Sequence, residues 1–125
     1  MKIDKNISLL AIVWILLTGC VSTHAPQSSS RNVLGTVWIG SDSMGAYNEF
    51  HFLPRGTLHY RTPTGFWKNA TWKQNGSSIY METNHKYAEY RGSIHGNTMS
   101  GKAWNIKGLH WTWRAKKTAK KASRR

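Results

Sequence analysis

From Val33 to Trp113, apolar side chains recur at every second position, and Gly or Asn interrupts this alternation at intervals of about eight to twelve residues. Successive side chains of a β-strand point to opposite faces, so this period places one apolar face along a series of short strands. The same range contains no amphipathic helical pattern. The sequence therefore predicts an all-β domain, an up-and-down meander of eight short antiparallel strands.

Turn signals between these strands predict which residues lie opposite one another. The predicted loops are Ser43-Met44-Gly45, Pro54-Arg55-Gly56, Pro63-Thr64-Gly65, Asn75-Gly76, Asn84-His85, Gly96-Asn97 and Ile106-Lys107-Gly108. The expected cross-strand pairs include Trp38 with Phe50, Phe50 with Tyr60, Tyr60 with Lys68, Trp72 with Ile79, Ile79 with Tyr90, Gly92 with Gly101, and Gly101 with Trp113.

This register keeps one face apolar through all the strands, a consistency expected of a foldable sequence. The predicted inner face consists of Trp38, Phe50, Phe52, Leu58, Tyr60, Ala70, Trp72, Ile79, Met81, Ala88, Tyr90, Ile94, Met99, Ala103, Leu109, Trp111 and Trp113. The predicted outer face carries His51, His59, Arg61, Lys73, Glu82, Glu89, Lys102 and Arg114, with Val37 and Ile39 as apolar exceptions. An open meander leaves two unpaired edges, so we expect a closed barrel in which the strand of Trp38 lies beside that of Trp113.

The N-terminal segment differs from the rest of the chain. A charged start precedes the apolar run from Ile7 to Leu17, which is too short to span a bilayer and indicates a helical signal segment. The following residues, Leu17-Thr18-Gly19-Cys20, resemble the lipobox of bacterial lipoproteins, in which the cysteine is acylated and becomes the first mature residue. An ordinary signal peptide with a chance cysteine is the alternative.

The lipoprotein resemblance implies four segments. Residues 1–19 are a signal peptide, 20–32 the lipidated Cys20 with a flexible tether, 33–115 the barrel and 116–125 a basic tail. Val21 follows the cysteine in place of the Asp that retains enteric-type lipoproteins at the inner membrane. The resemblance therefore implies an outer-membrane lipoprotein that faces the periplasm of a Gram-negative cell.

A second resemblance concerns the first strand. The segment Asn32 to Trp38 places a Gly shortly before a Trp, and this is similar to the first strand of calycins, the group of lipocalins and avidins. Here the spacing is Gly-x-x-Trp, whereas those families usually show Gly-x-Trp. The resemblance implies a calycin-like barrel and transfers no ligand-binding residue.

The formal net charge is +13, and much of it lies at the C-terminus, in Lys116, Lys117, Lys120, Lys121, Arg124 and Arg125. A run so rich in like charge and poor in apolar residues predicts a mobile tail. We expect anionic partners, namely lipid headgroups, lipopolysaccharide phosphates or acidic polymers such as peptidoglycan. Nucleic acid is not expected as a partner of an exported protein. Simple solubility is the alternative explanation of the tail.

The sequence carries no pattern typical of catalysis. It has no nucleophile elbow, phosphate-binding loop or zinc-protease motif, and its only cysteine is the expected lipidation site. The predicted register sets Glu82 and Glu89 on the outer surface, where they cannot face each other across a cleft. It also sets His51 opposite His59, but two ligands without a free cysteine are too few for a zinc site. We therefore expect no enzyme, metal or cofactor.

Two functional hypotheses remain. The first is a lipid-anchored, non-catalytic binding module whose basic tail contacts anionic envelope components. The second is a carrier or sensor that binds a small hydrophobic or aromatic ligand inside the barrel. Its ligand-binding residues would be Trp38, Tyr60, Lys68, Tyr90, Trp111 and Trp113. A small barrel is also commonly filled by its own side chains, so the inner aromatics have a purely structural alternative.

Overall fold

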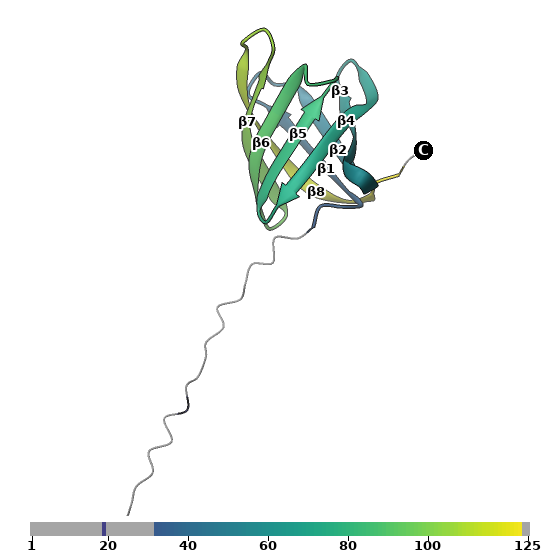
Figure 1. Cartoon of the computed structure of the whole chain (residues 1–125), viewed down its shortest axis with the longest axis vertical. Helices are drawn as coiled ribbons and strands as arrows, with labels where there is room; N and C mark the ends of the chain where they lie inside the picture. The colour runs from purple at the N-terminus through teal and green to yellow at the C-terminus, as the bar shows by residue number, and fades with distance from the viewer. Residues whose placement is uncertain (1–18, 20–31, 124–125) are drawn as a thin grey trace, which may run out of the picture.

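A computed structural model describes Gly19 and residues 32–123 of the chain. Antiparallel strands follow one another in chain order and close into one barrel (Figure 1). The elements are β1 (Thr36–Asp42), β2 (Tyr47–Leu53), the 3-10 turn η1 (Pro54–Gly56), β3 (Thr57–Thr62), β4 (Gly65–Asn75), β5 (Ser78–Thr83), β6 (Ala88–His95), β7 (Thr98–Asn105) and β8 (His110–Lys121). The predicted eight-stranded all-β meander and its closure are confirmed.

Within the part of the chain that the structure describes, no helix is long and apolar enough to cross a membrane. The predicted helical signal segment and the lipidation site Cys20 lie outside the described residues.

Four of the predicted hairpins have the expected register. Trp38 faces Phe50 between β1 and β2, and Phe50 faces Tyr60 between β2 and β3. Gly101 faces Gly92 in β6 and Trp113 in β8. These pairs confirm that turn chemistry alone specified half of the sheet, because each loop has a length and a glycine position that permit one register.

Two hairpins differ from the prediction by two residues. Trp72 pairs with Met81 rather than Ile79, and Ile79 pairs with Gly92 rather than Tyr90. The second shift arises because the β5–β6 connection is longer than expected, with Asn84, His85 and Lys86 at φ values of 49°, 53° and 65°. A shift of two residues leaves every side chain on its predicted face, so the set of residues predicted to face the interior is unchanged.

The β3–β4 hairpin contains a bulge that the sequence analysis did not predict. Thr62 pairs with Gly65, so the loop is shorter than expected, and the register then shifts between Leu58 and Tyr60. As a result Tyr60 faces Trp67 and not Lys68. A bulge adds one residue to one strand and bends it, which helps a sheet to curve into a barrel.

The interior is the predicted apolar face with few exceptions. The buried cluster is Val33, Trp38, Phe50, Phe52, Leu58, Tyr60, Ala70, Ile79, Met81, Ala88, Tyr90, Ile94, Met99, Ala103, Trp113 and Ala115, with Trp72 and Trp111 partly buried against it. The inward placement of Leu109 is wrong. Leu109 is 48% exposed because it lies in the β7–β8 connection, beyond the last pair of the two strands, Trp104 with His110.

The outer face holds one apolar residue that is fully covered. Val37 is 0% exposed although it points outward, opposite His51. The β1–β8 register shifts between Thr36 and Trp38, and the Thr118 hydroxyl donates a hydrogen bond to the Val37 carbonyl at 3.1 Å. This irregular part of the seam packs around Val37, so the predicted register of the first hairpin stands.

The barrel has two different ends, which we name the base and the rim (Figure 1). The base is the end where the described chain enters at residues 32–35; it also holds the β2–β3, β4–β5 and β6–β7 connections and the end of β8. Val33 is 1% exposed and belongs to the core cluster, so it seals the base from within. The rim holds the other four connections.

Candidate functional site

The base carries a set of cations that form no ion pair within the described residues. We name this set the base surface; it consists of Arg55 in η1, Lys73 in β4, and Lys116, Lys117, Lys120 and Lys121 in β8. All are exposed except Lys117, which is half-buried. No described Asp or Glu forms an ion pair with these cations, although the charge of Lys120 helps to lower the pKa of Glu49 in β2. The other cations of the base surface present uncompensated positive charge.

The structure differs from the sequence-based expectation at the C-terminus. Residues 116–121 belong to β8, where Lys117 faces Trp38 and Lys121 faces Thr36 of β1. The run forms a strand because pairing with β1 closes the barrel, and that gain outweighs repulsion between exposed lysines that alternate with Ala115, Thr118 and Ala119. Arg124 and Arg125 lie outside the described residues.

The described carboxylates lie in the rim half of the barrel, and each has polar partners. Glu49 accepts hydrogen bonds from the Tyr47 hydroxyl and from His51 Nε2, both at 2.6 Å, and pairs with Arg61 at 3.7 Å. Burial raises the pKa of Glu49, but the bonds from Tyr47 and His51 outweigh it and lower the pKa below its usual value. We name these residues the Glu49 cluster; its charge is satisfied locally.

A second such group surrounds Glu89 on the wall of β5 to β7. The Tyr80 hydroxyl donates to Glu89 at 2.6 Å and lies 3.3 Å from Glu82, and Trp104 Nε1 donates to Glu89 at 2.9 Å. The hydrogen bond from Tyr80 is the main reason that the pKa of Glu89 is lowered. The Arg91 guanidinium lies over the rings of Tyr80 and Trp104, at 5.3 and 5.8 Å from their centroids. Glu89 is therefore hydrogen-bonded by Tyr80 and Trp104, and Arg91 contacts the same two aromatic rings.

The remaining acid, Asp42, organises a rim loop. Its carboxylate accepts the backbone N–H groups of Met44 and Ala46, each at 2.9 Å. Asp42 faces Trp113 across the seam, on the interior side of β1, and its charge adds to burial in raising the pKa of Tyr90 to about 12. Asp42 forms no ion pair with Lys102 or Arg114, the cations nearby on β7 and β8.

Six residues were predicted to hold a ligand inside the barrel. The five aromatic ones lie in the packed interior, whereas Lys68 does not. Trp38, Tyr60, Tyr90 and Trp113 are 1–9% exposed and Trp111 is partly buried. The Tyr90 ring packs edge-on against Trp111 and Trp113 at 5.8 and 5.9 Å between centroids. Lys68 is exposed on β4 and is not brought to them. An internal ligand would have to displace rings that now contact one another.

His51 and His59 face each other across β2 and β3, as the register predicted. His59 is buried, because Phe66 packs edge-on against both imidazole rings at 5.5 and 5.8 Å. Within residues 32–123, no group of three His, Cys, Asp or Glu converges in a way that could hold a metal ion. The pair is part of the packed outer wall beside the Glu49 cluster.

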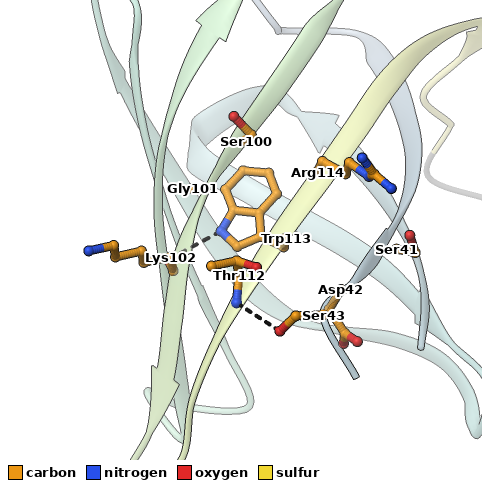
Figure 2. Close-up of a pocket in the computed structure, with 9 residues that line it drawn as sticks. All are labelled: Ser41, Asp42, Ser43, Ser100, Gly101, Lys102, Thr112, Trp113 and Arg114. Atoms are coloured by element: carbon orange, nitrogen blue, oxygen red, sulfur yellow. Dashed lines mark hydrogen bonds between the residues drawn. The ribbon is translucent and has the colours of Figure 1, made fainter. Parts of the chain in front are cut away.

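A hollow lies on the outer wall where β7, β8 and the end of β1 meet (Figure 2). We name it the seam groove. Its volume is about 490 Å³, and its lining consists of Ser41, Asp42, Ser43, Ser100, Gly101, Lys102, Thr112, Trp113 and Arg114. A smaller hollow of about 350 Å³ shares Ser41, Ser100 and Arg114 and extends it toward Lys116. Two exposed cations, four hydroxyl side chains and one carboxylate, that of Asp42, thus line one continuous surface.

The seam groove was missed as a site, although Lys102 and Arg114 were placed correctly on the outer face. The signal was present in two strands: Ser100-x-Lys102 and Thr112-x-Arg114-x-Lys116 each alternate outward polar residues. The seam between the first and last strands was predicted, but its register was not, because no turn connects the two strands that set Ser41 beside Arg114.

The fold defines a small closed antiparallel β-barrel of eight strands. No known protein family, no curated protein and no solved structure matches the chain.

Proposed function

We propose that this protein is a lipid-anchored, non-catalytic module of the bacterial cell envelope, with a calycin-like barrel whose base surface binds anionic envelope material. The observation that carries the proposal is the separation of charge along the barrel. The base surface holds unpaired cations, whereas the described carboxylates lie in the rim half and have polar partners there. Suitable partners are lipid headgroups, lipopolysaccharide phosphates and acidic polymers such as peptidoglycan.

The position of the base supports this proposal. The described chain enters the barrel at the base, a short distance in sequence after the expected lipidation site at Cys20. An acyl anchor would therefore attach at the end that carries the cations. Acyl chains and a polybasic surface act together in membrane binding, and each Lys or Arg close to an anionic leaflet contributes about 1 kcal/mol.

The arrangement of the acids supports a non-catalytic role. Glu82 and Glu89 are neighbours on adjacent strands of the outer wall and share the Tyr80 hydroxyl. A glycosidase needs its two carboxyl groups on either side of a substrate cleft. Here both carboxyl groups lie on one convex wall.

The test compares two triple variants of the full chain that lose the same charge. In the base variant, Lys116, Lys120 and Lys121 become Ala; in the rim variant, Lys68, Lys86 and Lys107 become Ala. Binding is measured by co-sedimentation with vesicles of phosphatidylglycerol and phosphatidylcholine. We expect the base variant to bind roughly 100-fold more weakly and the rim variant less than about threefold, because only the base lysines approach the lipid.

Vesicles of phosphatidylcholine alone provide the control for the apolar N-terminal segment and any acyl chain, which all variants share. Binding to them should not distinguish the variants. Equal losses for the base and rim variants on anionic vesicles would reject the base surface as the binding face. Unchanged binding of the base variant would reject the proposal altogether.

A further inference from the structure

The outer wall along the seam is organised in rows that run across three strands. Arg114 in β8 lies directly between Ser100 in β7 and Ser41 in β1, since both serines pair with it in register. In the next row toward the rim, Thr112 lies beside Lys102. Neighbouring strands are about 4.8 Å apart, so each row is short enough for one small ligand to contact all of its side chains.

The side chains of the first row have no protein partner. Arg114, Ser41 and Ser100 make no side-chain hydrogen bond or ion pair with another residue of the described chain. Arg114 and Ser100 are exposed and Ser41 is partly exposed. By contrast, Arg61 and Arg91 on the other walls contact Glu49 or aromatic rings. The guanidinium of Arg114 is therefore available to a ligand.

The second row is fixed in place by the backbone. The Ser43 N–H donates to the Thr112 carbonyl at 2.8 Å, and the Thr112 N–H donates to the Ser43 hydroxyl at 3.1 Å. The Trp113 indole lies beneath the strands and donates to the Lys102 carbonyl at 3.2 Å (Figure 2). Lys102 and Arg114 extend in opposite directions on either side of Thr112, and Ser41 lies beyond Arg114 (Figure 2). These hydrogen bonds fix the positions of Ser43, Thr112 and Trp113 in the absence of a ligand.

The donors of the groove favour one ligand chemistry. A guanidinium presents a planar fork of N–H donors that fits two oxygens of a phosphate, and flanking hydroxyls can donate to a third. The hydroxyls of Thr112 and Ser43 can both donate and accept, as the hydroxyls of a polyol require. The volume of about 490 Å³ falls within the range of small-molecule sites.

From these observations we infer that the seam groove binds a phosphate ester carried on a polyol, with the phosphate at Arg114, Ser41 and Ser100 and the polyol along Thr112 and Ser43. Sugar phosphates and glycerol phosphates share this chemistry. The inference does not depend on membrane binding by the base surface, because the first row contains none of the base cations.

Binding is tested by titrating the ¹⁵N-labelled full chain with glucose 1-phosphate, glycerol 3-phosphate, inorganic phosphate and glucose at constant ionic strength. We expect amide shifts at residues 41, 43, 100–102 and 112–114 for both phosphate esters, with weaker effects of phosphate and none of glucose. The stronger of the two esters identifies the polyol as a sugar or as glycerol.

Two substitutions that each remove one positive charge separate a built site from general attraction of anions. Arg114→Gln should weaken the binding of the better ester about tenfold or more, because a charge-assisted fork is lost. Lys68→Gln, on the exposed part of β4, should change it less than about twofold. Ser100→Ala should weaken it with no change in fold.

Three results would overturn the inference. These are shifts confined to the base lysines, equal binding by the Arg114→Gln and Lys68→Gln proteins, and saturation by glucose without phosphate. A base variant limited to Lys120→Ala and Lys121→Ala should retain groove binding, because neither lysine lines the two hollows. A base variant that loses vesicle binding but still binds the ester would show that the base surface and the seam groove are independent sites.

Discussion

The base and the rim of this barrel are made from similar short hairpins, yet they present different chemistry. At the base, Val33 fills the interior, the lysines of β8 form no ion pair within the described part of the chain, and one apolar side chain, Leu34, is 45% exposed. At the rim, apolar side chains are exposed in the loops, with Met44 at 56%, Ile106 at 74% and Leu109 at 48%. The carboxylates lie in this half as well.

This difference shows that the fold and the charges are largely independent. The interior face of each strand holds the barrel together, so outward residues at either end can change without affecting the core. Lysines without partners add little to stability and repel one another. We therefore propose that their concentration at one end serves binding and not folding, and the three predictions below test how far the two ends differ.

The largest effect is expected from ending the chain after Ala115. This removes residues 116–121 from β8 and with them the pairs to Thr36, Trp38 and Ile39. Only the pairs of Gly40, Ser41 and Asp42 with β8 then remain, and the base half of β1 becomes an open edge beside an uncovered core. We therefore expect complete loss of cooperative thermal unfolding in near-ultraviolet circular dichroism. A chain that ends after Ser123 is the control and should keep its stability within about 0.5 kcal/mol. A native spectrum from the shorter chain would show that the seam is dispensable.

A moderate effect is expected from truncating Val33, which is 1% exposed at the base, to Ala. Lost burial and the cavity left behind should cost about 2 kcal/mol, or roughly 10 °C in Tm. Ile106→Ala removes a larger aliphatic side chain at the rim, where 74% exposure predicts a change within about 0.5 kcal/mol. Differential scanning calorimetry compares the two variants. Equal losses would mean that the base is no better sealed than the rim.

The smallest effect is expected from Glu49→Gln in the rim half. Hydrogen bonds from Tyr47 and His51 lower the pKa of Glu49, so the ionised form stabilises the fold above its unfolded pKa of about 4.3. We expect a loss of about 1–2 kcal/mol in urea unfolding at pH 7, shrinking as the pH falls below about 4. Glu82→Gln, whose Tyr80 contact is 3.3 Å, is the control and should cost less. A loss that persists unchanged at pH 3 would contradict the assigned cause.

The sequence predicted the fold class, the strand number, the closure and nearly the whole interior. Period two determines which face a residue occupies, and this information survives shifts such as Trp72 pairing with Met81. Loop geometry was harder, because three successive non-glycine residues from Asn84 to Lys86 adopt left-handed φ values that local chemistry disfavours. The bulge beside Tyr60 was likewise a product of barrel curvature, which no local pattern records.

The site was predicted less well than the fold. The sequence predicts that the lysines from Lys116 to Lys121 bind anions, and this stays a prediction. Their charge also suggested a mobile tail, because the strand β1 that orders them is far away in the sequence. The seam groove shares that difficulty. Ser41 and Arg114 meet only because the barrel closes, so local spacing could not reveal them together.

Closure through β1 and β8 also has a consequence for biogenesis. The contact between residues 36 and 121 cannot form until nearly the entire polypeptide has emerged, and such distant pairings form slowly. The chain would thus stay unfolded during synthesis and acquire its structure only after the last strand arrives.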